Sequence, residues 1–199
     1  MRRVPVPFIL LLAAFALFVA PDPALAAWSL GANLGVTVHN PTEDGDDTVT
    51  LIGFPTQASA FSSLRPGLRI GYAGQAMTHE GYLDLSYDSQ SADGDDLHAL
   101  RLAANYQYNF GADSSVKPYV TIGAGLFNLG YDAGFGSVGA TSATFGGGIG
   151  MGMPVSDDRG RLRWELRYDR LGEGEDNGAT IIGEAGIISV LFGFDLWMR

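Results

Sequence analysis

The chain has 199 residues, a net charge of −10, a single lysine and no cysteine. This length fits one domain, and the absence of cysteine excludes disulfides, thiolate metal sites and a cysteine nucleophile. The acidic balance and the lack of a basic run argue against a nucleic-acid partner, because binding phosphates requires clustered Lys and Arg.

The first 26 residues have the three parts of a secretory signal peptide. Arg2 and Arg3 precede an apolar run over residues 8–20, and Ala24-Leu25-Ala26 forms a small-x-small cleavage site. The apolar run is too short for a helix that spans a bilayer, which needs about 20 residues. We therefore expect a cleaved signal peptide over residues 1–26 and one mature domain over residues 27–199.

From residue 27 onward, apolar and polar residues alternate with the period of two that is typical of β-strands. The alternation predicts eight strands, over residues 28–39, 64–72, 81–87, 98–110, 118–126, 143–155, 162–168 and 188–198. Short connections between these strands alternate with mostly longer ones that are rich in glycine or acidic residues. This layout is typical of an up-and-down barrel that crosses an outer membrane.

Two kinds of barrel fit this alternation: a water-soluble one with an apolar interior, such as a lipocalin, and a membrane one with an apolar exterior. One face of the strands is almost continuously apolar, and the other carries charges and bare glycines. Glycines fit a crowded lumen, where they leave room for long side chains from the opposite wall, whereas on an exposed surface they would only weaken the strands. Aromatic residues near the strand ends, such as Trp28 and Phe110, are typical of interfacial girdles. We therefore expect an all-β fold, an eight-stranded antiparallel up-and-down transmembrane β-barrel.

The mature chain resembles the small OmpA/OmpX-type superfamily of eight-stranded outer-membrane β-barrels of Gram-negative bacteria. The resemblance is carried by residues 117–125 (KPYVTIGAG), by the glycine-laced sixth strand and by the aromatic final strand over residues 192–197 (FGFDLW). The final strand is similar to the signal recognised by the barrel-assembly machinery, although such signals usually end in Phe and this chain ends in Trp197-Met198-Arg199. The resemblance implies a monomer in the cell outer membrane, in contact with outer-membrane lipid and lipopolysaccharide.

Charged residues of both signs are predicted to point into the lumen, and two interpretations of them remain open. In a lumen that side chains nearly fill, a mutually paired network would plug the barrel. Alternatively, the charges line an ion-selective pathway, and the protein is a narrow channel or porin for small solutes or ions. The predicted lumen charges are Arg69, Asp84, Arg101, Arg163, Glu165, Arg167 and Asp169.

Acidic residues cluster in two of the predicted outer loops. Clustered carboxylates of this kind could bind Ca²⁺ or Mg²⁺, and the ions could bridge to lipopolysaccharide phosphates. Their spacing does not match an EF-hand loop, and solvated, mutually repelling loops are the simpler interpretation. Arg170, at the outer end of the seventh predicted strand, is a better candidate for contact with a lipid phosphate. The acidic loop residues are Glu43, Asp44, Asp46, Asp47, Asp93, Asp95 and Asp96.

A lipid A-modifying enzyme is the third hypothesis. Palmitoyltransferases of this membrane use a His in an early outer loop with an Asp-Ser pair in a later one, and His39, Asp88 and Ser89 could approach one another in the same way. No surrounding motif supports this set of three common residues. We therefore expect a non-enzymatic protein without catalytic residues, a metal site or a cofactor, with a structural or surface-interaction role through its acidic outer loops.

Overall fold

The structure is a computed structural model that describes residues 27–41, 50–52, 65–74, 77–92, 95–111, 115–133, 136–155, 159–176 and 178–198. Three short strands are β2 (Thr50–Ile52), β9 (Gly174–Asp176) and β10 (Ala179–Ile182). No helix among these residues is long and apolar enough to span a membrane. The eight long strands are β1 (Ala27–Pro41), β3 (Arg65–Ala73), β4 (His79–Ala92), β5 (Asp95–Asn109), β6 (Lys117–Ala133), β7 (Gly136–Val155), β8 (Gly160–Leu171) and β11 (Ala185–Met198).

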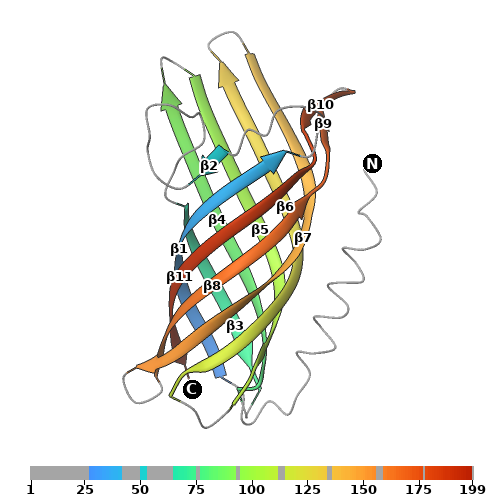
Figure 1. Ribbon diagram of the computed structural model, residues 1–199. Helices are drawn as coiled ribbons and strands as arrows, with labels where there is room; N and C mark the ends of the chain where they lie inside the picture. Colours follow the sequence, from blue (N-terminus) through green and yellow to red (C-terminus); the bar gives the residue numbers. More distant parts are fainter. Residues whose placement is uncertain are drawn as a thin grey trace.

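The eight long strands form a closed antiparallel barrel (Figure 1). Each pairs with its neighbours in the chain, and β11 pairs with β1, which leaves no open edge along the barrel wall. When the register is followed once around the barrel, it leaves β1 at Gly31 and returns at Pro41, a stagger of ten residues. Such a stagger tilts the strands by about 35–45° to the barrel axis, and the tilt is visible in Figure 1.

The predicted fold class and the order of the eight strands are confirmed. Because β1 and β11 pair from Trp28↔Met198 onward, the barrel wall begins and ends at the same end, here called the terminal end. The short connections β3–β4, β5–β6 and β7–β8 also lie there. The opposite end is called the loop end.

Two of the loop-end connections are shorter than the sequence pattern predicted. β4 continues to Ala92 and β5 begins at Asp95, while β6 continues to Ala133 and β7 begins at Gly136. The sheet of β4, β5, β6 and β7 therefore projects beyond the barrel wall (Figure 1). In this projection the outward residues are polar or glycine, as at Asn128, Gly130 and Thr141, so that hydropathy stops alternating although the backbone pairing continues.

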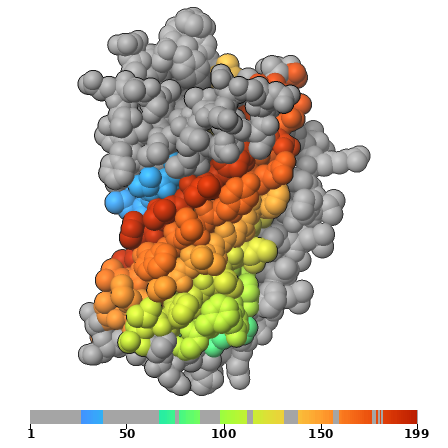
Figure 2. Space-filling view, in the orientation of Figure 1, coloured from blue at the N-terminus to red at the C-terminus, as the bar shows by residue number. Residues whose placement is uncertain are grey.

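The two faces of the barrel wall have the opposite polarity to those of a water-soluble protein. Large apolar side chains point outward, where Ile122 is 66% exposed and Phe145 and Phe192 are each 60% exposed. Arg69 and Asp195 point inward and are 0% exposed. The sequence alternative of a lipocalin-like barrel is therefore wrong, because the apolar face covers the exterior and the charged face the interior. Figure 2 shows the outer surface as adjacent diagonal bands of β1, β11, β8 and β7.

Aromatic side chains border this apolar exterior at the terminal end. Trp28 and Tyr72 meet edge to face with ring centroids 5.1 Å apart, and Tyr108 and Phe110 do the same at 4.8 Å. Their rings have an apolar body, and tyrosine and tryptophan add one polar atom, a combination that suits the boundary between hydrocarbon and water. The aromatic residues near strand ends that the sequence analysis assigned to an interfacial girdle, Trp28 and Phe110, thus lie together at the terminal end.

Candidate functional site

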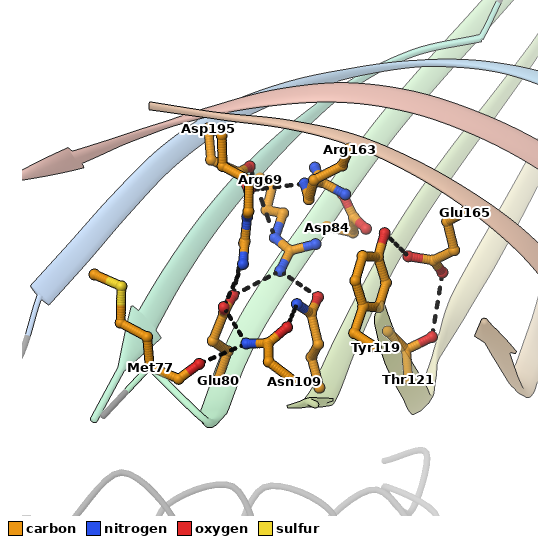
Figure 3. Close-up of polar contacts among 12 residues, drawn as sticks. Arg69, Met77, Glu80, Asp84, Asn109, Tyr119, Thr121, Arg163, Glu165 and Asp195 are labelled. Carbon is orange, nitrogen blue, oxygen red and sulfur yellow. Dashed lines mark hydrogen bonds and ion pairs between the residues drawn. The ribbon is translucent and has the colours of Figure 1, made fainter. Parts of the chain in front are cut away.

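The interior of the barrel at the terminal end is filled by a cluster of ion pairs, here called the terminal cluster (Figure 3). Asp195 on β11 accepts hydrogen bonds from Arg161 Nη2 at 2.8 Å and from Arg163 Nε at 2.7 Å, both on β8. Its Oδ1 atom also lies 4.0 Å from Arg69 Nε on β3. Glu80 on β4 accepts hydrogen bonds from Arg161 Nη2 at 2.8 Å and from Arg69 Nη2 at 3.2 Å. Two carboxylates therefore hold three guanidinium groups from two strands, β3 and β8.

Amide side chains fill the gaps between these charges. Arg69 donates to Gln107 Oε1 at 2.9 Å, Gln107 donates to Asn109 Oδ1 at 2.6 Å, and Asn109 donates to Glu80 Oε1 at 2.6 Å. The Arg69 guanidinium also lies 3.3 Å from the centre of the Tyr82 ring, a cation–π contact. The charges of the terminal cluster are thus paired with one another and are also surrounded by packed amide and aromatic side chains.

Asn33 on β1 connects a sixth charged residue, Asp84, to the terminal cluster. Its amide nitrogen donates to Asp84 Oδ1 at 2.6 Å, and its amide oxygen accepts a hydrogen bond from Arg163 Nη2 at 2.5 Å. Asp84 and Arg163 are therefore connected through one neutral side chain.

A second group of ion pairs, here called the middle cluster, lies farther toward the loop end. Asp169 accepts hydrogen bonds from Arg101 Nη2 at 2.7 Å and from Arg167 Nε at 2.8 Å. Arg101 comes from β5, whereas Asp169 and Arg167 are both on β8, so the first contact crosses the lumen. Arg167 Nη1 also lies 3.5 Å from Glu165, which accepts hydrogen bonds from Tyr119 and Thr121 at 3.2 Å each.

The two clusters are electrically balanced. They contain five arginines and five carboxylates, so their formal charges cancel. Taking both charges of a pair out of water is costly, and the cost is offset only when each partner is closely matched and hydrogen-bonded. The members are Arg69, Arg101, Arg161, Arg163 and Arg167 with Glu80, Asp84, Glu165, Asp169 and Asp195.

Four inward-facing glycines of β7 make room for these clusters. A Cβ atom on Gly146 would lie 2.3 Å from Asp169 Oδ1, and one on Gly148 would lie 2.9 Å from Glu165 Oε1. At Gly150 the same atom would lie 2.4 Å from Tyr119 Cζ, and at Gly152 it would lie 2.7 Å from Arg161 Cδ. These separations are too short for any side chain, so the glycines provide the space that large lumenal side chains occupy.

Residues 10–186 match the family model of the outer membrane protein beta-barrel domain. The chain belongs to this family. Its fold is similar to that of Neisserial surface protein A, with a TM-score of 0.65 and 17% identity over 85% of this chain and 97% of that one. It is also similar to Ail, the attachment invasion locus protein of Yersinia pestis (TM-score 0.53, 9% identity, 87% and 99% covered). A major outer membrane protein of Thermus thermophilus gives a TM-score of 0.53, with 11% identity over 87% and 99% of the two chains. No curated protein matches the chain.

Family membership explains the inverted polarity of this outer-membrane barrel. Its exposed Leu, Ile, Val and Phe side chains form the band that contacts lipid hydrocarbon, and the closed sheet pairs each strand in that band with a neighbour on both sides. The charged clusters are therefore enclosed by the wall of a membrane protein, away from the lipid.

All seven predicted lumen charges lie in the interior, in the two clusters, but the prediction missed three further members. Glu80 and Arg161 lie one residue before the predicted starts of their strands, at residues 81 and 162, whereas the observed strands begin at His79 and Gly160 and include both. Asp195 lies on the polar face of the predicted last strand, but the predicted set of lumen charges does not include it. Extending the alternation by two residues, from Arg163 to Arg161, would have found one of them.

The other predicted sites lie mostly outside the described residues. Residues 43–47 and 93 are not described, and Asp95 and Asp96 are described only as backbone at the start of β5. Among the side chains that the structure does describe, no group of His, Asp and Glu could hold a metal ion. The three candidate enzyme residues are likewise described only as backbone: His39 lies in β1, and Asp88 and Ser89 lie in β4, with β3 between these strands.

Proposed function

We propose that this outer-membrane barrel is a non-enzymatic, non-conducting protein that acts at the cell surface through its acidic outer loops. In this proposal the terminal end faces the periplasm and the loop end faces outward. The observation that carries it is the balance of the interior, in which five arginines and five carboxylates are joined by short contacts from wall to wall. A barrel of eight strands has an interior that side chains can fill, so a paired network of this size leaves little path for ions.

The charge of the whole chain supports a role for the loops. Since the two clusters are neutral together, the net charge of −10 arises from residues outside them. A structure of Ail from Yersinia pestis holds the heparin analogue sucrose octasulfate, a polyanion. Acidic loops would repel such a ligand, so we propose a basic surface or a cation-bridged lipopolysaccharide as the partner of this chain.

The non-conducting state is tested by recording single-channel currents from the refolded protein in a planar bilayer, after heat-dependent gel mobility has shown that it is folded. We expect no discrete current steps from the native protein. Arg101→Ala, which removes the contact across the lumen, should lower the free energy of unfolding and still produce no steps.

A narrow channel is the second candidate, and one observation favours it. Several buried polar atoms, among them Arg69 Nη1 and Arg167 Nη2, have no hydrogen-bond partner among the described residues. In a conducting state of the lumen, these buried N–H groups would become donors to a passing anion. Reproducible current steps from the native protein that change in size with Arg101→Ala would establish the channel. They would refute the proposal that the two ionic clusters block the lumen.

The role of the loops is tested by neutralising the first acidic loop with Glu43→Gln, Asp44→Asn, Asp46→Asn and Asp47→Asn. With a labelled oligolysine peptide as probe, we expect the folded variant to bind at least about tenfold more weakly than the native barrel at low ionic strength, since exposed charges attract over roughly a Debye length. Glu184→Gln, which removes one acidic group outside that loop, is the matched control and should retain binding. Equal affinity of the two variants would contradict a role for this loop.

A further inference from the structure

The hairpin of β9 and β10 follows β8 at the loop end of the barrel (Figure 1). Ala179 pairs with Asp176 and Thr180 with Glu175. Between the two strands, Gly178 has a φ of 83°, a backbone conformation that glycine adopts without steric cost. A two-stranded hairpin with strands this short has little stability of its own. Its position must therefore be determined by contacts with the barrel.

One such contact is apolar and is made by Ile182, the last residue of the hairpin. Ile182 is only 4% exposed and belongs to one cluster of buried side chains with Phe127, Leu171 and Ile187, here called the apolar layer, together with Ala140 and Ala185. A side chain at a loop position of a membrane barrel has no need to be buried in this way. The hairpin therefore places the Ile182 side chain among buried side chains that belong to the strands of the barrel wall.

The apolar layer lies on the inward face of the barrel. Leu171 follows Asp169 by two residues on β8, and Ile187 precedes the buried Ser189 by two residues on β11, so that each shares the inward face with residues of the lumen. Phe127 has the same relation to the inward-facing Gly125 on β6. The interior thus changes from ionic at the terminal end and the middle to apolar at the loop end, where Ile182 joins it.

Polar contacts hold both ends of the hairpin. Before it, Gly172 N donates to Ala143 O at 3.0 Å, and Ser142 Oγ donates to Gly172 O at 2.5 Å. After it, Glu184 accepts a hydrogen bond from Arg170 Nη2 at 2.7 Å, and the side chains of this ion pair are 41% and 49% exposed. Arg170, which the sequence suggested as a ligand of lipid phosphate, therefore contacts the base of the hairpin. An exposed ion pair of this kind is weak and sensitive to salt.

We propose that the β9–β10 hairpin is a lid on the loop end of the lumen, with Ile182 as its plug and the Arg170–Glu184 ion pair as its latch. The lid keeps water from the apolar layer and, below it, from Asp169 and Arg167. Because the plug is one side chain and the latch is exposed, the lid opens more easily than any part of the barrel wall. The lid concerns the mouth of the barrel, so it is independent of whether the ionic clusters conduct.

The absence of cysteine from the chain permits a direct test. Leu171→Cys places a single thiol in the apolar layer, and its rate of modification by a charged, membrane-impermeant methanethiosulfonate reagent reports how often water reaches that layer. We expect slow modification with the native hairpin and at least about tenfold faster modification when Ile182→Ala is added. Ile182→Val, which keeps most of the plug, should remain slow. Raising the ionic strength should increase the rate about two- to fivefold with the latch intact and have no further effect in Glu184→Gln.

Two controls keep the test decisive. Glu175→Cys, at an exposed position of β9, gives the rate for a thiol in open water and should be unchanged by Ile182→Ala. Thr144→Cys is a second reporter, because Thr144 is buried and pairs with Leu171 in the register, and threonine and cysteine are similar in size. If the thiol at residue 171 reacts as fast as the thiol at residue 175 in the otherwise native protein, the mouth is open and the lid is refuted. An unchanged rate with Ile182→Ala, in a variant shown to be folded by gel mobility, would also refute it.

Discussion

Asp195→Asn is expected to destabilise the barrel by about 3–5 kcal/mol, the usual cost of removing one partner of a buried ion pair. The carboxylate of Asp195 is fully buried and accepts hydrogen bonds from Arg161 and Arg163, with Arg69 4.0 Å away. Without its charge, Arg163 keeps only the link through Asn33 to Asp84, and Arg161 and Arg69 share the carboxylate of Glu80. The measurement is the free energy of unfolding in urea of the protein folded in lipid vesicles.

Glu184→Gln is the matched control for Asp195→Asn, because it makes the same chemical change in an ion pair that is half exposed. Exposed pairs contribute at most about 1 kcal/mol, so the control should remain near the native stability. The double variant Asp195→Asn with Arg163→Met should lose less free energy of unfolding than the sum of the losses in the two single variants. The reason is that Arg163→Met removes one of the guanidinium groups that Asp195→Asn leaves unpaired. If the free energy of unfolding of Asp195→Asn lies within about 1 kcal/mol of that of the native protein, the terminal cluster does not stabilise the barrel as described.

Ile149→Arg is expected to cost about 2–4 kcal/mol, the penalty for an arginine on the lipid face near the middle of the bilayer. Ile149 is 58% exposed and lies between Phe145 and Met153 on the outward face of β7, with apolar residues on both sides. The free energy of unfolding in vesicles is again the measurement. The penalty should disappear for the protein in detergent micelles of short chain length, where the guanidinium group reaches water.

Thr141→Arg is the control for the lipid face, because it lies on the outward face of the same strand beyond the apolar band, where it contacts Asn128. At this height the cost of an arginine should fall to about 0–1 kcal/mol. Equal costs at residues 141 and 149 would show that the apolar band does not mark the position of the hydrocarbon.

Much of the candidate site follows from alternation alone, and the two missed residues at strand ends share one cause. Arg163, Glu165, Arg167 and Asp169 alternate with apolar residues in the middle of β8, where lipid outside and charges inside impose opposite polarities. Glu80 and Arg161 lie at the ends of strands, where the outward neighbour is no longer required to be apolar and the pattern fades. Their inward direction follows from backbone hydrogen bonds to the next strand, which hydropathy does not encode.

Sequence by itself determined the class of this protein, its eight crossing strands and the face that each side chain takes, because a period of two between lipid and lumen constrains every residue within the bilayer. Only the tertiary structure decided which charges pair. Arg101 reaches Asp169 across the lumen, and Asp195 meets arginines of β8, because the stagger of the closed barrel brings these positions together. The burial of Ile182 beside Leu171 was likewise beyond the sequence, since it depends on where a short hairpin packs at the loop end of the barrel rather than on any local pattern.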